Sequence, residues 1–167
     1  MYKDMEYKEY REEVNRIFQR YIRKGFVDYS SCSWLENDLT NLLLAASETL
    51  SKRGEYTDGK WHIKLKDVYK KLGDDDGYRS ELLEAMDRRP GNKELWTEYK
   101  ALFSAEEWPE ICNDYFNGLG EPSYGACPWY AMENRYDLVI EAAEQNESSD
   151  IIKTYEKKLK VLYLRAL

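Results

Sequence analysis

The acidic run Asp74-Asp75-Asp76-Gly77 is the part of the sequence that comes nearest to a metal-binding pattern. Closely spaced carboxylates followed by glycine are typical of calcium-binding loops, in which the glycine is the sixth residue. With Gly77 in that place, positions one and twelve of the loop fall on leucines, Leu72 and Leu83. Two required carboxylates are therefore missing. The run is interpreted as a solvated turn between the third and fourth helices, in which Asp75 or Asp76 caps the fourth helix.

Cysteine and histidine chemistry is equally poorly supported by the spacing. A closed zinc site needs four Cys or His ligands, and the chain has a single histidine, His62, with Cys32, Cys112 and Cys127. No second histidine completes an HExxH pair, and nothing in the sequence places His62 beside a cysteine to form a nucleophile pair. Phosphate-binding glycine loops and a nucleophile elbow are also absent. No catalytic, cofactor-binding or metal-ligating residue is assigned, and the chain is predicted not to be an enzyme.

Charge and hydropathy limit the partners and the compartment. The chain has 32 acidic and 25 basic residues, a formal net charge of -7, and no basic block longer than Lys157-Lys158. Such a chain repels a phosphate backbone, so direct nucleic-acid binding is disfavoured. No run of 18 apolar residues is present, and the first residues do not show the basic and apolar regions typical of a signal peptide. Three cysteines do not suggest a disulfide framework. A soluble cytoplasmic protein with reduced, mostly buried thiols is expected.

The spacing of apolar residues predicts amphipathic helices and no strand. The first helix runs to Gly25 and carries apolar residues every three or four positions, at Tyr7, Tyr10, Val14, Ile17, Phe18, Tyr21 and Ile22. Ser33 and Glu36 form a capping-box pattern before the second helix, which ends at Gly54. The second helix has the most apolar face of the chain and is predicted to be the most buried, through Leu35, Leu39, Leu42, Leu43, Ala46 and Leu50.

Glycine, proline and helix-capping residues mark the ends of the later helices. Gly73 ends the third helix, and Pro90 closes the fourth because proline cannot continue a helix. Asn92 is predicted to cap the fifth helix, whose inward residues are Leu95, Trp96, Tyr99, Leu102 and Phe103. Ser104 and Glu107 form a second capping-box pattern before the sixth helix. In residues 122–134, any helix is broken or begins at Pro128, and the last helix is capped by Ser148 or Ser149.

One helical hairpin is written twice in the sequence. Residues 68–86 and 98–116 align without a gap at an offset of 30, and a shorter third copy lies around residues 130–140. The aromatic residues Tyr78, Trp108 and Tyr136 each begin the second helix of a hairpin. Hairpins that cannot bury their apolar faces alone stack side by side, which predicts a right-handed array of the tetratricopeptide kind.

The aromatic residues have two interpretations. The 15 tyrosines exceed the usual needs of such a core, and tyrosine is favoured on surfaces that a partner covers. Tyr69, Tyr99 and Tyr136 are expected to pack between hairpins. Aromatics outside the repeat are the candidates for lining a groove that holds a peptide or another domain, namely Tyr2, Tyr10, Tyr29, Tyr56 or Trp129.

Several segments together resemble a known family. The run GFVDYSSCSWLENDL, followed by YKKLGDDDGYRSELLEAM, RRPGNKELW, MENRYDLVIEA and IIKTYEKKL, is similar to the helical region after the zinc motif in bacterial SWIM zinc-finger family proteins. The resemblance covers most of the chain, but the defining C-x-C…C-x-H zinc signature is absent. It therefore carries over no ligand residues. What it implies is a helical scaffold associated with proteins that contact DNA or other proteins.

These observations lead to one expected architecture and two functions. We expect a single all-α domain over residues 1–167, with a helix pair in 1–56, repeat hairpins in 57–147 and a terminal helix in 148–167. Eight or nine helices are expected to stack as antiparallel hairpins. The expected function is a non-enzymatic protein–protein interaction scaffold that holds another protein or domain, without a cofactor. The alternative is an accessory helical region of a SWIM-type nucleic-acid-associated protein, which a basic stripe of Arg11, Arg16, Lys52, Arg53 and Lys157 would favour.

Overall fold

All secondary structure that the computed structural model describes is helical. It describes residues 6–24, 32–51 and 59–164, with the backbone alone for residues 32–36, 51, 163 and 164. Within these ranges it has ten α-helices and no strand, which confirms the all-α prediction. The terminal helix predicted from Ser148 or Ser149 divides at Tyr155 into two, α9 (Ser149–Thr154) and α10 (Glu156–Leu164). None of the helices in these ranges is long and apolar enough to span a membrane.

The helices group into two compact units that meet in sequence at Arg89 and Pro90. The first unit contains α1 to α4 and the second contains α5 to α10. Proline lacks the backbone N–H that a continuing helix needs, so the chain leaves α4 at this point. The boundary lies inside the 57–147 segment, which was expected to form one part of a single domain.

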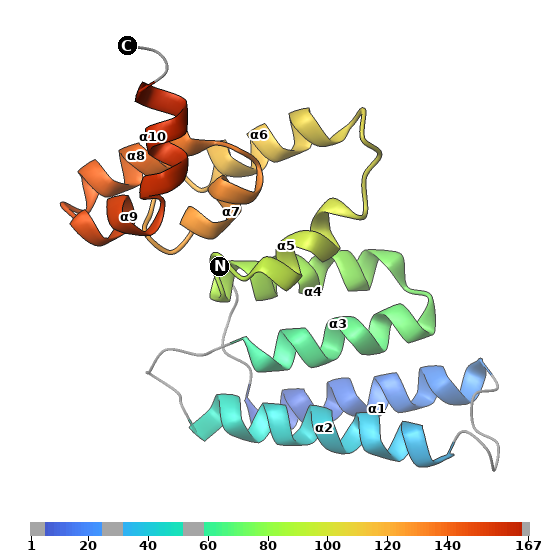
Figure 1. Ribbon diagram of the computed structural model, residues 1–167. Helices are drawn as coiled ribbons and strands as arrows, with labels where there is room; N and C mark the ends of the chain where they lie inside the picture. The colour runs from blue at the N-terminus through green and yellow to red at the C-terminus, as the bar shows by residue number, and fades with distance from the viewer. Residues whose placement is uncertain (1–5, 25–31, 52–58, 165–167) are drawn as a thin grey trace. The chain divides into compact units, whose positions relative to one another are not determined.

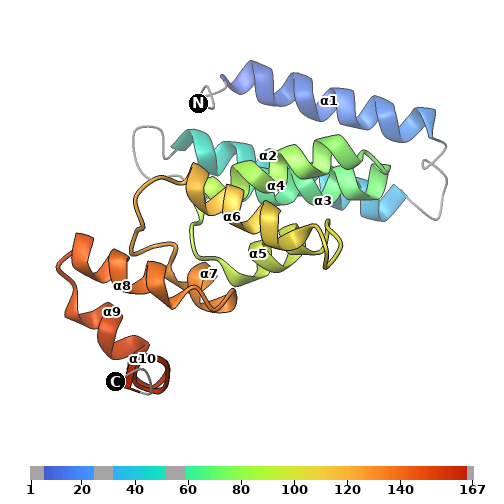
Figure 2. The same ribbon diagram turned by 90° about the horizontal axis from the view of Figure 1, so that it is seen from above.

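The first unit consists of four helices in which consecutive helices run in opposite directions (Figures 1 and 2). Each helix packs against the next. In chain order they are α1 (Tyr7–Arg23), α2 (Cys32–Ser51), α3 (Lys60–Leu72) and α4 (Asp75–Arg88). The edge of the Tyr10 ring meets Trp61 at a centroid distance of 4.8 Å and links α1 directly to α3. The core of α1 to α3 is Tyr10, Val14, Ile17, Tyr21, Leu42, Ala45, Ala46, Trp61, Leu65, Val68 and Leu72.

The turn between α3 and α4 is the acidic run that resembled a calcium loop. Gly73 ends α3 with a φ of 71°, as predicted for a C-terminal glycine. Asp74, and not Asp75 or Asp76, is the N-cap of α4, because its Oδ1 accepts the backbone N–H of Gly77 at 2.9 Å. Its Oδ2 pairs with Arg20 of α1 at 2.9 Å. Asp74 therefore serves as a helix cap and as a link between α1 and α4.

Replacing Asp74 by alanine tests this assignment. We expect Asp74→Ala to lower the free energy of unfolding by about 1–2 kcal/mol, because the cap bond to Gly77 and the pairing with Arg20 are both lost. Asp75→Ala is the matched control, since Asp75 lies in the same exposed first turn, and it should change stability by only about 0.5 kcal/mol. Urea unfolding followed by far-UV circular dichroism measures both. Equal effects of the two substitutions would contradict the assignment.

The second unit packs around aromatic side chains. It contains α5 (Lys93–Lys100), α6 (Trp108–Gly118), α7 (Cys127–Met132) and α8 (Tyr136–Gln145), followed by α9 and α10. Trp96 is fully buried at its centre, stacked on Phe116 and Trp129 at centroid distances of 5.1 Å and in edge contact with Trp108 and Tyr115. Tyr78 in the first turn of α4, Trp108 at the start of α6 and Tyr136 at the start of α8 are all buried.

The ends of the helices in the second unit follow the predicted signals, with one difference. Asn92 caps α5 by accepting the N–H of Leu95 at 3.0 Å, and Ser104 and Glu107 exchange the two bonds of a capping box. However, α5 ends at Lys100, so Leu102 lies beyond the helix and is 41% exposed rather than buried. After Lys100 the backbone N–H groups of Leu102 and Phe103 donate to the carbonyls of Tyr99 and Lys100, so the chain tightens into turns before the capping box at Ser104.

Gly91 fixes the way the chain enters the second unit. Its φ is +86°, in the left-handed region that favours glycine. A Cβ atom at this position would lie 2.1 Å from the carbonyl oxygen of Gly125 and 3.1 Å from Cδ of Pro128. The loop before α7 therefore packs directly on the backbone of this turn. The indole N–H of Trp129 holds the same contact by donating to the carbonyl of Asn92 at 2.8 Å.

Candidate functional site: a groove between α1 and α2

Two adjacent apolar stripes run along α1, and only one of them is covered. The buried stripe consists of Tyr10, Val14, Ile17 and Tyr21. The second stripe leaves Phe18 half-buried and contains Tyr7 and Ile22, which are 50% and 44% exposed. Successive residues of a helix are about 100° apart, so these two stripes lie side by side on the helix surface. The sequence analysis described all seven residues as the apolar positions of one amphipathic helix and did not separate the two stripes.

The second wall of the groove comes from leucines of α2. Leu42 is fully buried, whereas its neighbours Leu43 and Leu44 are 37% and 57% exposed. Three consecutive leucines on a helix point in three directions, because successive residues are about 100° apart. Of the three, Leu42 points into the core of the first unit. The prediction that Leu43 lies in the core, on the most buried helix, was therefore wrong. Its side chain lines the groove with Leu39.

The two helices enclose an open groove with a volume of about 740 Å³. Its apolar floor is formed by Val14, Phe18, Leu39 and Leu43, and polar or charged residues of α1 lie around it. From Tyr7 to Phe18 the α1 side of the groove is about 16 Å long, which corresponds to three helical turns. The residues that line it are Tyr7, Lys8, Arg11, Glu12, Val14, Asn15, Phe18, Leu39 and Leu43.

The charged residues of the groove differ in how they are partnered. Lys8 and Glu12 form an exposed pair one turn apart, with Nζ and Oε1 at 3.8 Å. The guanidinium group of Arg11 lies 5.8 Å from the centre of the Tyr7 ring. Within residues 6–24, 32–51 and 59–164, no ion pair to a carboxylate is found for Arg11. The groove thus combines an apolar floor with a cation that pairs with no carboxylate there.

A second hollow of the first unit is acidic, and most of its charges are paired. It has a volume of about 420 Å³ and is lined by residues of α1, α3 and α4. Glu13 pairs with Arg16 and accepts the hydroxyl of Tyr69 at 2.8 Å. Burial, followed by this bond to Glu13, raises the pKa of Tyr69 well above its usual range. Internal pairs thus occupy most of the charged groups of this hollow, and the bond between Tyr69 and Glu13 links α3 to α1. The buried indole N–H of Trp61, which also lines the hollow, has no hydrogen-bond partner among the described residues.

His62 is paired with a glutamate in the part of the chain that the structure describes. Nδ1 of His62 lies 2.5 Å from Oε2 of Glu81, and both side chains are largely buried between α3 and α4. Cys112 and Cys127 belong to the second unit, where burial raises the pKa of each thiol, to about 11 for Cys112. A raised pKa keeps a thiol protonated and unreactive. The side chain of Cys32 lies outside the described residues, among which no cluster of metal-ligating residues occurs.

Two of the aromatic residues proposed to line a groove, Tyr10 and Trp129, are buried instead. Tyr10 and Trp129 are 2% and 0% exposed and belong to the cores of the two units. Tyr2, Tyr29 and Tyr56 lie outside the described residues. The aromatic residues in the groove are Tyr7 and Phe18, which the sequence analysis counted among the apolar positions of the first helix without naming them as groove residues. The available signal was the number of apolar positions on that helix, which exceeds what one buried stripe holds.

The basic residues considered for nucleic-acid contact are distributed over both units. Arg11 lies in the groove, whereas Arg16 is paired with Glu13 on another side of α1. Lys157 is on α10 in the second unit, and Lys52 and Arg53 lie outside the described residues.

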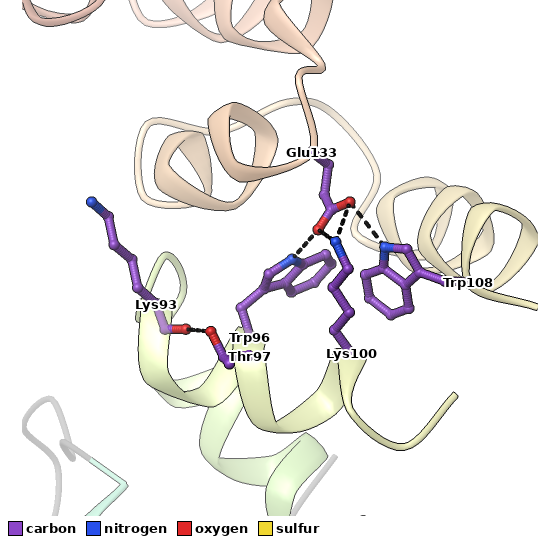
Figure 3. Close-up of polar contacts among 6 residues, drawn as sticks. All are labelled: Lys93, Trp96, Thr97, Lys100, Trp108 and Glu133. Atoms are coloured by element: carbon purple, nitrogen blue, oxygen red, sulfur yellow. Dashed lines mark hydrogen bonds and ion pairs between the residues drawn. The ribbon is translucent and has the colours of Figure 1, made fainter. Parts of the chain in front are cut away.

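The strongest polar cluster of the second unit is centred on Glu133, directly after α7 (Figure 3). Its two carboxylate oxygens accept the indole N–H groups of Trp96 and Trp108, each at 2.9 Å, and Nζ of Lys100 lies 3.1 Å and 3.3 Å from them. Burial alone would raise the pKa of Glu133, but these hydrogen bonds and the positive charge of Lys100 outweigh it, so the pKa lies below its usual range. The cluster joins α5, α6 and α7, and its carboxylate is occupied by internal donors.

Comparison with protein-family models, with curated proteins and with solved structures found no match to the chain.

Proposed function

We propose that this chain is a non-enzymatic protein–protein interaction scaffold and that it binds a helical segment of a partner in the groove between α1 and α2. The observation that carries the proposal is the uncovered apolar stripe of α1 beside Leu39 and Leu43. Large apolar side chains that remain exposed together, with polar residues around them, mark surfaces that bind other molecules. A function in binding also agrees with the internally paired state of His62, Glu81 and Glu133.

The shape of the groove favours a helix over an extended peptide or a small ligand. An amphipathic helix presents apolar residues at positions i, i+3, i+4 and i+7, which cover about three turns. The α1 side of the groove is about 16 Å long and therefore matches this repeat. It is open along its length rather than closed around a ligand. The alternating directions of α1 to α4 support a scaffold of stacked antiparallel helices as the frame of this groove (Figure 1). The offset of 30 residues between hairpins in the sequence supports the proposal that the chain is a helical repeat of the tetratricopeptide kind.

Two adjacent leucines of α2 allow a matched test. The probe is a fluorescein-labelled amphipathic helical peptide about five turns long, with a leucine face and an uncharged face of glutamine and alanine. We expect Leu43→Asp to weaken its binding at least about tenfold, because a carboxylate in the apolar floor stays desolvated under the bound helix. Leu44→Asp is the control, since Leu44 is exposed and does not line the groove. Fluorescence anisotropy measures the affinity of each variant.

Two outcomes would contradict the proposal that the groove binds a helix. If Leu43→Asp and Leu44→Asp bind the peptide as the unaltered protein does, the groove is not a docking site. If the unaltered protein binds a DNA duplex and no leucine-faced peptide, the nucleic-acid-associated alternative replaces the proposal. Circular dichroism of both variants shows whether each remains folded, which is expected because both side chains are exposed.

A further inference from the structure

The charges at the groove specify its partner more closely than its shape does. Among its lining residues are two cations, Lys8 and Arg11, and one anion, Glu12, so the groove has an excess of positive charge. The chain as a whole has a net charge of -7. Because Lys8 and Glu12 pair with each other, the excess is one positive charge, at Arg11, on a chain that is acidic as a whole. Complementary charges across an interface set which partner is accepted and in which orientation.

Arg11 supplies the net positive charge of the groove. Lys8 and Glu12 already form a pair, whereas Arg11 contacts only the face of the Tyr7 ring among the interactions of the described residues. Arg11 shares the α1 stripe with Tyr7 and Phe18, because positions 7, 11 and 18 lie within about 40° of one another around the helix. A helix seated on Phe18 and Leu43 would therefore bring the edge of its apolar face to the guanidinium group.

We infer that the natural partner of this groove is an amphipathic helix with a glutamate or aspartate at the edge of its apolar face, and that this carboxylate pairs with Arg11. The inference rests on the proposed function and adds the charge of the ligand to it. Arginine suits this role because its planar guanidinium group holds a carboxylate through two parallel hydrogen bonds while it still stacks on an aromatic ring. The bound helix would exclude water from the ion pair between its carboxylate and Arg11, which strengthens the electrostatic attraction.

Reversing the charge on the peptide, and then on Arg11 of the protein, tests the inference. The probes are two forms of the leucine-faced peptide, one with glutamates and one with lysines at the edges of the leucine face. We expect the unaltered protein to bind the glutamate form about fivefold more tightly, the effect of one partly exposed ion pair. Arg11→Glu should reverse this preference. In about 1 M salt the preference should largely disappear, because exposed charges are then screened within about 3 Å.

A second variant separates the effect of the charge in the groove on peptide binding from the effect of the net charge of the chain. Lys158→Glu changes the net charge of the chain by the same amount as Arg11→Glu, but at an exposed position of α10 in the second unit. It should leave the preference for the glutamate peptide intact. If both peptides bind equally and Arg11→Glu changes nothing while Leu43→Asp still abolishes binding, the inference about charge is wrong and the docking groove stands. If neither peptide binds the unaltered protein, both the inference and the proposed function are wrong.

Discussion

Replacing Glu133 by alanine is expected to lower the stability of the second unit by about 3 kcal/mol. The carboxylate is the acceptor for the indole N–H groups of Trp96 and Trp108, and both of these rings are buried. Each buried donor left without an acceptor costs about 1–3 kcal/mol. Lys100 also loses its pairing partner. The side chain of Glu133 thus holds three elements together through one group.

Hydrogen exchange measured by mass spectrometry locates this effect. We expect Glu133→Ala to increase exchange most strongly in peptides from α5, α6 and α7, which the carboxylate joins. Glu144→Ala is a suitable control, because it removes an exposed glutamate from α8. An exchange pattern of Glu133→Ala that matches Glu144→Ala would show that the cluster contributes nothing to stability.

The pH dependence of unfolding provides an independent reading of the same cluster. Because the pKa of Glu133 is lower in the folded than in the unfolded chain, its ionised form stabilises the fold at pH values above the unfolded pKa of about 4.3. This contribution is lost as the pH falls through the folded pKa. Glu133→Gln keeps the shape but does not ionise. The stability difference between the two proteins should therefore shrink below pH of about 4, whereas a constant difference would contradict the assignment.

Replacing Trp96 by alanine is expected to have the largest effect of any single truncation in the second unit, about 4 kcal/mol. Trp96 is fully buried and stacks on Phe116 and Trp129, so its removal leaves a cavity among rigid rings that cannot easily close. It also removes the N–H that Glu133 accepts. Aromatic pairs add about 0.5–1.5 kcal/mol each beyond the burial of their area.

The control for Trp96→Ala is Leu102→Ala, which removes an apolar side chain that is 41% exposed just beyond the same helix. It should cost less than about 1 kcal/mol, because little burial is lost. Urea unfolding followed by far-UV circular dichroism compares the two variants without relying on the fluorescence of the tryptophan that is removed. A loss for Trp96→Ala no larger than that for Leu102→Ala would mean that the aromatic cluster is not the core of this unit.

Helix positions were predictable because the signals for them are local. The repeat of apolar residues at three and four positions arises from the helix itself, and caps such as Asn92 bond to backbone groups only a few residues away. The same holds for the capping box of Ser104 and Glu107 and for Pro128 at the start of α7. The misplaced cap at Asp74 shows the limit of such signals, because three successive aspartates offer equivalent candidates.

The candidate site could not be predicted in this way. An apolar stripe in the sequence indicates that one face of a helix favours burial. It does not indicate which neighbouring helix covers that face. On α1 the sequence contains enough apolar residues for two stripes, and the packing of α2 and α3 covers only one of them. Leu43 changes from an expected core residue to a lining residue of the groove for the same reason.

The sequence by itself determined that the chain is helical, where most of its helices begin, and that aromatic residues such as Trp96 and Tyr99 face inward, although it offered the buried Tyr10 and Trp129 as groove residues. Those properties depend on interactions over a few residues or on the strong tendency of large rings to leave water. Only the tertiary structure decided which apolar stripe of α1 stays open and that Glu133 meets Trp96 and Trp108, which lie 37 and 25 residues away in sequence. Contacts of this kind depend on how helices pack, and no periodicity of a single helix records them.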